Sequence, residues 1–298
     1  MGEDPNAWNN KHGHLQYDKS MAKTVMTNDI NQFRQVGMTE HNSTEVLIID
    51  IGNTRAKWAV VENQTVGRRG VMPTDDLLAT LPEILEESDA PVSWSCVIPD
   101  LADLLSNALL KSGRQAWRLT CHDAPGLSFT TYPKPEQIGH DRIANAIGAQ
   151  ALVGSPAAVI DIGTAMTFDL VTMQYGFIGG IIAPGLAMMT DYLQEKVSLL
   201  PELPPENLTL GPRIGRSTIE AMSVGCTRGY LGMIQTLLEG VREEFSELGE
   251  DEPTVILTGG ATRGFIREAL SEYRAEPDLT LLGLAEAQLR RLASSKSG

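Results

Sequence analysis

Two segments with the same residues in the same order could bind a charged ligand. Residues 46–54 are Val-Leu-Ile-Ile-Asp-Ile-Gly-Asn-Thr, and residues 157–164 are Ala-Ala-Val-Ile-Asp-Ile-Gly-Thr. Each apolar stretch ends in an aspartate, Asp50 or Asp161, and then turns on a glycine. A carboxylate at a strand end suits Mg²⁺, and the N–H groups of a tight turn suit phosphate oxygens. Either segment alone is better explained as an ordinary hairpin, but the two together favour a nucleotide clamped between related halves.

A third segment, residues 139–149, combines an acid and a base at the predicted start of a helix. Its sequence is Gly-His-Asp-Arg-Ile-Ala-Asn-Ala-Ile-Gly-Ala. The positive end of the helix dipole favours an anion there, and Arg142 can pair with a carboxylate through two hydrogen bonds. Asp141 is then free to accept a proton from a substrate hydroxyl, whereas His140 has a weaker claim to that role. The competing explanation is an aspartate in the first helical turn beside a surface arginine.

Two glycine-rich segments indicate a close approach of the backbone to another group. Residues 258–261, Thr-Gly-Gly-Ala, follow an apolar stretch, and paired glycines would let adenine or ribose come close. A plain strand-to-helix turn is the alternative. Residues 176–185, Gly-Phe-Ile-Gly-Gly-Ile-Ile-Ala-Pro-Gly, place glycines inside a strand, where they cost stability and usually mark such an approach. The chain has neither G-x-x-x-x-G-K-[ST] nor G-x-G-x-x-G, so P-loop and Rossmann sites lack their fingerprints.

Strands and helices that alternate along the chain must position these segments. Apolar runs between turn residues predict strands, and apolar residues three and four apart predict helices. The predicted strands cover residues 46–51, 56–61, 91–99, 177–183, 254–258 and 277–282, and residues 157–171 are predicted to form a strand, a turn and a second strand. The predicted helices cover residues 75–88, 101–110, 141–152, 185–200 and 218–245, and two more follow residue 260.

The repeated Ile-Asp-Ile-Gly indicates a duplicated architecture. Asp161 follows Asp50 by 111 residues, a domain-sized spacing rather than that of a solenoid repeat. We therefore expect two α/β lobes, residues 46–152 and 153–298, with a cleft between them. Residues 1–44 are polar and lack apolar periodicity, so we expect a disordered extension without an assigned function.

Composition limits the classes of partner. The 298 residues are 42% hydrophobic and 21% charged, as in a soluble globular protein, and the formal net charge is −14. That charge argues against nucleic-acid binding but is compatible with a local nucleotide site. Cys96, Cys121 and Cys226 are widely spaced, which predicts buried thiols in a reducing compartment. No apolar run is long enough for a membrane span or a secretory signal, so we expect a cytoplasmic protein.

The ordered motifs resemble a known family. The chain carries DIGNTRAK, SCVIP, GHDRIANAIGA, DIGTAMTFD, GGIIAPG, GRSTIEAMSVG, LTGGA and PDLTLLGL between residue 46 and about residue 285. In this order they are similar to the type III pantothenate kinases, which belong to the superfamily of acetate and sugar kinases, Hsp70 and actin. The resemblance implies an α/β fold of two ribonuclease H-like domains of the actin-like ATPase type, with the nucleotide between the lobes.

The same resemblance implies a reaction and a set of site residues. The reaction is the phosphorylation of pantothenate to 4′-phosphopantothenate by ATP with Mg²⁺, the first step of coenzyme A synthesis, in a homodimer that requires K⁺ or NH₄⁺. Asp141 would be the base, and Asp161 would hold the monovalent cation and Asp50 the magnesium. ATP would contact Asp50, Ile51, Gly52, Asn53, Thr54, Arg55, Ala56, Lys57 and Thr164. Pantothenate would contact Tyr132, Gly139, His140, Asp141, Arg142 and Thr218.

Two other functions stay open at the level of the sequence. One is a non-catalytic regulator of the Bvg accessory factor type, although the presence of Asp50, Asp141, Arg142 and Asp161 favours an enzyme. The other is a different small-molecule kinase of the same superfamily, which only the resemblance in the GHDR and GRST segments and at Tyr132 argues against.

Overall fold

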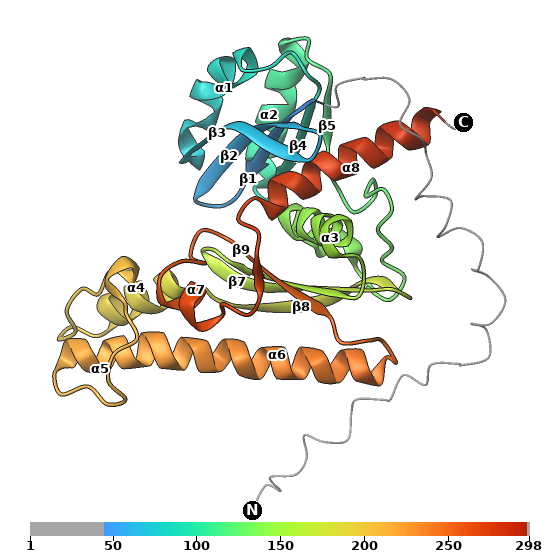
Figure 1. Ribbon diagram of the computed structural model, residues 1–298. Coiled ribbons are helices and arrows are strands. Elements are labelled where there is room, and N and C mark those ends of the chain that lie inside the picture. Colours follow the sequence, from blue (N-terminus) through green and yellow to red (C-terminus); the bar gives the residue numbers. More distant parts are fainter. Residues whose placement is uncertain (1–44, 297–298) are drawn as a thin grey trace, which may run out of the picture. The chain divides into compact units, whose positions relative to one another are not determined.

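The computed structural model describes residues 45–296, which belong to one compact unit. The extension expected over residues 1–44 lies outside the described residues. The described part of the chain is built on two five-stranded mixed sheets with helices packed on them (Figure 1). It contains no helix that is both long and apolar enough to cross a membrane.

The first sheet starts with an antiparallel meander and continues with parallel strands. Its order is β3-β2-β1-β4-β5, and helices α1 and α2 connect the strands that follow the meander. The elements are β1 (Val46–Ile51), β2 (Arg55–Glu62), β3 (Thr65–Pro73), α1 (Leu77–Glu86), β4 (Val92–Cys96), α2 (Pro99–Lys111) and β5 (Ala116–Arg118). Strand β4 pairs in parallel with both β1 and β5.

The second sheet repeats this topology. Its order is β10-β9-β6-β7-β8, so that β6 takes the place of β1 and β9 the place of β4. Its strands are β6 (Ala157–Ile162), β7 (Ala165–Thr172), β8 (Gly176–Pro184), β9 (Thr254–Thr258) and β10 (Arg274–Ala275). The two hairpins and the two parallel pairs recur in the same order. The predicted duplicated α/β fold is confirmed.

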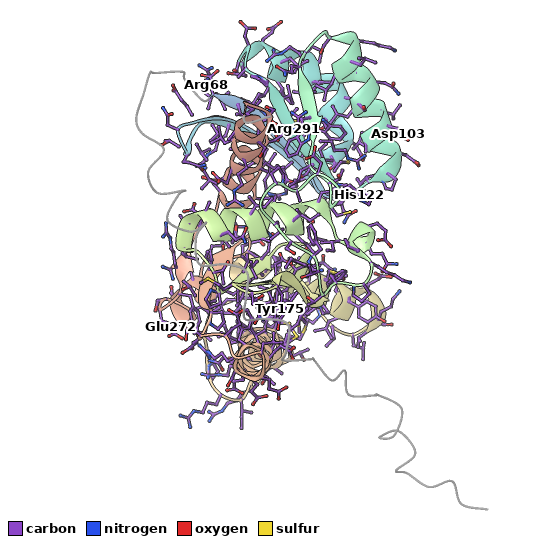
Figure 2. The ribbon with its side chains drawn as sticks, turned by 90° about the vertical axis from the view of Figure 1, so that its right-hand side faces the viewer. Arg68, Asp103, His122, Tyr175, Glu272 and Arg291 are labelled. Atoms are coloured by element: carbon purple, nitrogen blue, oxygen red, sulfur yellow. The ribbon has the colours of Figure 1, made fainter. Side chains whose placement is uncertain are left out.

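Two helices pack against each other and against strands of both sheets. These are α3 (His140–Val153) and α8 (Leu279–Lys296), which lie side by side in Figure 1. Figure 2 shows α8 beside the first sheet, where the guanidinium of Arg291 lies 5.4 Å from the centre of the Trp117 ring. The remaining helices are α4 (Leu186–Lys196), α5 (Thr218–Val224), α6 (Tyr230–Glu247) and α7 (Phe265–Ala269).

Alternation along β1 explains why its entire run is apolar. Leu47, Ile49 and Ile51 pack into the core with α1 and α2, whereas Val46 and Ile48 pack into the core with α3 and α8. Both faces of this central strand are therefore buried, and the strand end that carries Asp50 is held rigidly.

Several element predictions need correction. Residues 277–282 were expected to form a strand, but they enter α8, and the last strand is the short β10 just before. A short apolar run does not distinguish a strand from a buried helix. The helix predicted over 218–245 is interrupted by a π-helical turn, Gly225–Gly229, and the helix predicted over 185–200 ends at Lys196. Strands β3 and β5 carry too little apolar pattern to be predicted.

Candidate active site

The first repeated turn lies at the end of β1. Asp50 is 7% exposed, and its Oδ1 accepts a hydrogen bond of 2.6 Å from Ser95 Oγ at the equivalent level of β4. Lys57 stands opposite Asp50 in the register of β1 and β2. The amide of Gly52 closes the turn by donating to the carbonyl of Arg55, and Thr74 Oγ1 donates to the carbonyl of Gly52. The turn is therefore held in place before any ligand binds.

The side chains of this first turn point in two directions. Asn53, Thr54 and Arg55 are exposed, so they are available to a ligand. Ile51 and Ala56 are fully buried in the core between the first sheet and helices α1 and α2. Only their backbone could therefore contact a nucleotide.

The second repeated turn lies at the end of β6 and is closed in the same way. The amide of Gly163 donates to the carbonyl of Ala165 over 2.9 Å. Thr164 is exposed, and its Oγ1 lies 3.3 Å from Oγ1 of Thr54. The structure thus brings the two repeated turns within hydrogen-bond distance of each other.

The Thr-Gly-Gly-Ala segment packs against the second turn. The amide of Ala261 donates to the carbonyl of Ile162, and Gly259 has a φ of +95°. A Cβ on Gly259 would lie 2.4 Å from Oδ1 of Asp161. The backbone oxygen and nitrogen of Ile162 would lie 2.5 Å and 2.6 Å from the same Cβ, so glycine is required here by both conformation and space.

Asp141 lies at the start of α3, with Gly139 as the N-cap. Its Oδ1 accepts a hydrogen bond of 2.8 Å from the amide of Arg142. Burial and, after it, the charges of Asp50 and Asp169 together raise the pKa of the Asp141 carboxyl to about 7. The charge of Asp161 acts in the same direction. The three acids that the sequence singled out are thus close enough to influence one another's ionisation.

Arg142 pairs with an aspartate that the sequence analysis did not identify. Its Nε donates to Oδ1 of Asp169 over 2.5 Å, and its Nη2 donates to the carbonyl of Phe168 over 2.9 Å. The expected pairing through two hydrogen bonds to one carboxylate is therefore replaced by one bond to a carboxylate and one to the backbone. The pKa of Asp169 is raised to about 6, because the effect of burial exceeds the opposing effect of the Arg142 charge. An aspartate inside the apolar run of β7 was the available signal, because a fully buried acid needs a partner.

Asn145 is the second residue that the sequence analysis missed. It is 1% exposed, and its Nδ2 donates to Oδ2 of Asp161 at 3.0 Å and to Oδ2 of Asp169 at 3.4 Å. Its position four residues after Asp141, on the same face of α3, was the signal that could have revealed it.

Tyr132 and His140 lie beside this group. The ring of Tyr132 meets the edge of Phe177 with centres 5.8 Å apart, and the guanidinium of Arg142 lies 5.8 Å from the same Phe177 ring. Nδ1 of His140 lies 3.0 Å from the carbonyl oxygen of Cys96. Burial and the charge of Arg118 lower the pKa of His140, so that the neutral imidazole is favoured.

Thr218 lies on a different element from the substrate-binding candidates at the start of α3. It is the first residue of α5 and is exposed. Its neighbours form a capping box, because Ser217 accepts from the amide of Glu220 while Glu220 accepts from the amide of Arg216. The GRST segment therefore has a local structural role at a helix start.

The site has more acids than bases. Burial raises the pKa of Asp50 against the effects of Lys57 and Ser95, and it raises the pKa of Asp161 against those of Asn145 and Lys57. Buried carboxylates in excess of basic partners fit bound cations. Residues 45–296 contain no cluster of three or more histidine, cysteine, aspartate or glutamate side chains that could hold a metal ion. Phosphate or water oxygens would have to complete the coordination of a cation here.

Comparison with known proteins places the chain in a family. Residues 46–240 match the family model described as type III pantothenate kinase. A type III pantothenate kinase of Akkermansia muciniphila is 39% identical over 242 residues, which cover 80% of this chain and 96% of the relative. The enzyme of that name from Agathobacter rectalis is 31% identical over 255 residues, which cover 80% of this chain and 95% of the relative.

A solved structure supports the fold alone. A Campylobacter jejuni protein described as a Baf family transcriptional activator aligns with a TM-score of 0.56 and 19% identity, covering 83% of this chain and 99% of that one. The sequence relatives are similar enough, and span enough of the chain, to decide the family. The chain belongs to the type III pantothenate kinase family.

Proposed function

We propose that this protein phosphorylates pantothenate with ATP to give 4′-phosphopantothenate and ADP, the first step of coenzyme A synthesis. Membership of the family supports this reaction. The observation that carries it is the convergence of Asp50, Asp141 and Asp161, which come from the two repeated turns and a helix start and affect one another's pKa.

Asp141 is the base of the proposed reaction. It accepts the proton of the pantothenate hydroxyl while that oxygen bonds to the γ-phosphorus. The bond from phosphorus to the β,γ-bridging oxygen breaks, and ADP leaves with the electron pair. A carboxyl with a pKa of about 7 is well matched to this task near neutral pH.

Residues 50–57 and Thr164 bind the triphosphate in this proposal. Exposed Asn53, Thr54, Arg55 and Thr164 use their side chains, and buried Ile51 and Ala56 use their backbone. Because Lys57 lowers the pKa of both Asp50 and Asp161, its charge acts on both turns at once.

Two cations complete the nucleotide site in the proposal. Asp50 holds Mg²⁺, and Asp161 holds K⁺ or NH₄⁺. When bound, these ions neutralise the charge of the triphosphate. The excess of buried acids in the protein supports both assignments.

Pantothenate binds beside the start of α3 in this proposal. Gly139, His140 and Arg142 contact it from the helix start. Tyr132 also contacts it, because Tyr132 and Arg142 both lie beside the Phe177 ring. Arg142 supplies Nη1, which has no hydrogen-bond partner within residues 45–296.

In this proposal the protein is a homodimer, in which Thr218 of one subunit contacts the pantothenate bound to the other. Large apolar side chains are exposed on α4, on the loop after it and at the start of α5, namely Met188, Tyr192, Val197, Leu199, Leu210, Ile214 and Ile219. We call these seven side chains the apolar face. A group of large exposed apolar side chains is typical of a protein–protein interface. A second copy is the occupant that we propose, because exposed Thr218 lies next to exposed Ile219 at the start of α5, on a different element from the helix start that carries Asp141 and Arg142.

The lobes and the compartment complete the proposal. We assign residues 46–152 and 153–298 to the two lobes, with α8 returning to pack on the strands of the first. The family and the composition support a cytoplasmic enzyme that binds neither nucleic acid nor membrane.

The decisive experiment measures ADP release with pantothenate, with and without K⁺, together with mass spectrometry of the product. Wild type should form phosphopantothenate only with K⁺ or NH₄⁺ present. Asp141→Asn should lower kcat about 10²–10⁴-fold. Turnover that survives this substitution would remove Asp141 from the base role, and no turnover by wild type would favour the regulator or a different acceptor.

A further inference from the structure

A buried polar network lies behind the candidate site and joins two of its parts. Its centre is Asn145. The Nδ2 of this residue donates hydrogen bonds to Asp161 and Asp169, and its Oδ1 accepts a hydrogen bond of 2.8 Å from Thr280 Oγ1. Asn145, Asp169 and Thr280 are 1%, 0% and 5% exposed, so ligands and solvent do not compete for these bonds. The partners determine the orientation of the amide, because carboxylates accept and the threonine hydroxyl can donate.

Asp169 fixes the other end of the network. Its carboxylate accepts a hydrogen bond from Nε of Arg142, and the carbonyl of Phe168 accepts one from Nη2 of the same arginine. Gly180 stands opposite Asp169 in the register of β7 and β8. A Cβ on Gly180 would lie 1.7 Å from the carbonyl oxygen of Phe168 and 2.6 Å from Nη2 of Arg142, so it would collide with the strand backbone and with the guanidinium bound there. This explains the glycine inside β8 that the sequence singled out.

The network therefore constrains both ligand-binding groups together. Asp161, proposed for the monovalent cation, and Arg142, proposed for pantothenate, share the Asn145–Asp169 pair as their common support. The side chain of Arg142 is only 11% exposed, and two of its three nitrogens are engaged. Its remaining nitrogen can be aimed at an acceptor only while Asp169 stays in place.

We propose that Asn145 and Asp169 are positioning residues that couple pantothenate binding at Arg142 to cation binding at Asp161. This inference rests on the proposed function. Residues that support a ligand from behind typically change affinity about 10–100-fold when they are removed. Because binding linkage is reciprocal, each ligand should strengthen the binding of the other by the same factor.

The experiment measures equilibrium binding as well as turnover. Pantothenate binding is followed by isothermal titration calorimetry with a non-hydrolysable ATP analogue and Mg²⁺ over a series of K⁺ concentrations, and KM, kcat and the K⁺ concentration for half activation are measured in parallel. In wild type the Kd for pantothenate should fall as K⁺ rises. Asp169→Asn should raise the Kd and KM for pantothenate about 10-fold or more, with a smaller change in the KM for ATP.

Asn145→Leu keeps the side-chain size but removes the shared donor. It should raise the K⁺ requirement about 10–100-fold and abolish the dependence of the pantothenate Kd on K⁺. Thr280→Val removes only the hydrogen bond to Oδ1 of Asn145. It should raise the K⁺ requirement and weaken the K⁺ dependence of the pantothenate Kd by less than Asn145→Leu does. This variant tests the proposal if Asn145→Leu does not fold. Exposed Asp103 and Asn107 on α2 provide matched controls, Asp103→Asn and Asn107→Leu (Figure 2 labels Asp103).

The outcomes separate the two claims. Wild type that fails to phosphorylate pantothenate would overturn the proposed function. An active wild type whose Asp169→Asn and Thr280→Val variants match the controls in Kd, KM and K⁺ dependence would overturn the coupling while leaving the proposed function intact.

Discussion

Oγ1 of Thr54 and Oγ1 of Thr164 lie 3.3 Å apart, although 110 residues separate them in the chain. Either oxygen can be the donor. Both are exposed, so a triphosphate could engage both hydroxyls at the same place. The contact joins the two copies of the repeated turn across the molecule.

Replacing both hydroxyls should weaken nucleotide binding. Each lost hydrogen bond is worth about 0.5–1.5 kcal/mol, so Thr54→Val with Thr164→Val should raise the KM for ATP roughly 5–150-fold. The KM for pantothenate should change much less. Initial-rate kinetics would measure both, with exposed Thr65→Val as the matched control. An unchanged KM for ATP would show that neither hydroxyl contacts the nucleotide.

The pH dependence of turnover should follow the Asp141 carboxyl. A base must be ionised, and the pKa of Asp141 in the free protein is raised to about 7. We therefore expect kcat/KM to fall tenfold per pH unit below about 7 and to level off above it. Bound cations favour the carboxylate, so the corresponding limb of kcat should lie at lower pH. A flat kcat/KM between pH 5 and 8 would contradict this assignment.

Asp141→Asn should stabilise the fold while it removes activity. In the folded state the pKa is raised, so stability is highest below the unfolded value near 3.8 and is lost as the pH rises to about 7. Asparagine mimics the neutral acid, so the variant should gain roughly 1–3 kcal/mol of unfolding free energy at pH 8 and almost nothing at pH 4. Thermal melts of ligand-free protein at both pH values would measure the difference, and an equal effect at both would contradict the burial argument.

Gly259→Ala should disturb Asp161 directly. The new Cβ would lie 2.4 Å from Oδ1 of Asp161 and would also require a backbone with φ of +95°. Such strain costs on the order of 1–3 kcal/mol, so both the melting temperature and activity should fall. Gly260→Ala is the matched control, because no atom lies within 4 Å of its Cβ and its φ is not positive. Similar effects of the two substitutions would show that neither the positive φ nor the close contacts of Gly259 with Asp161 and Ile162 is the cause.

A charge placed on the apolar face should separate the proposed dimer. Ile214 is 78% exposed on this face, and Ile214→Arg should give a monomer in sedimentation analysis with a raised KM for pantothenate. Leu110 is equally exposed on α2, so Leu110→Arg is the control and should leave the oligomeric state unchanged. A wild-type monomer, or an Ile214→Arg variant that remains dimeric, would contradict the placement of the interface.

The sequence by itself determined the duplication and the placement of the acids proposed for the site. The two Ile-Asp-Ile-Gly repeats put Asp50 and Asp161 at strand ends, because alternation along a buried strand and a glycine turn are local properties. Helical spacing placed Asp141 at the start of α3 in the same way.

Only the tertiary structure decided how these acids are supported. Asn145 bonds with Asp161 and Asp169 across helix–sheet contacts, and Thr280 reaches Asn145 from 135 residues away. Pairings of this kind depend on which faces pack together, and no local pattern encodes them. Local pattern also mistook the start of α8 for a strand, because its short apolar run fits either structure until packing against α3 and the first sheet selects the helix.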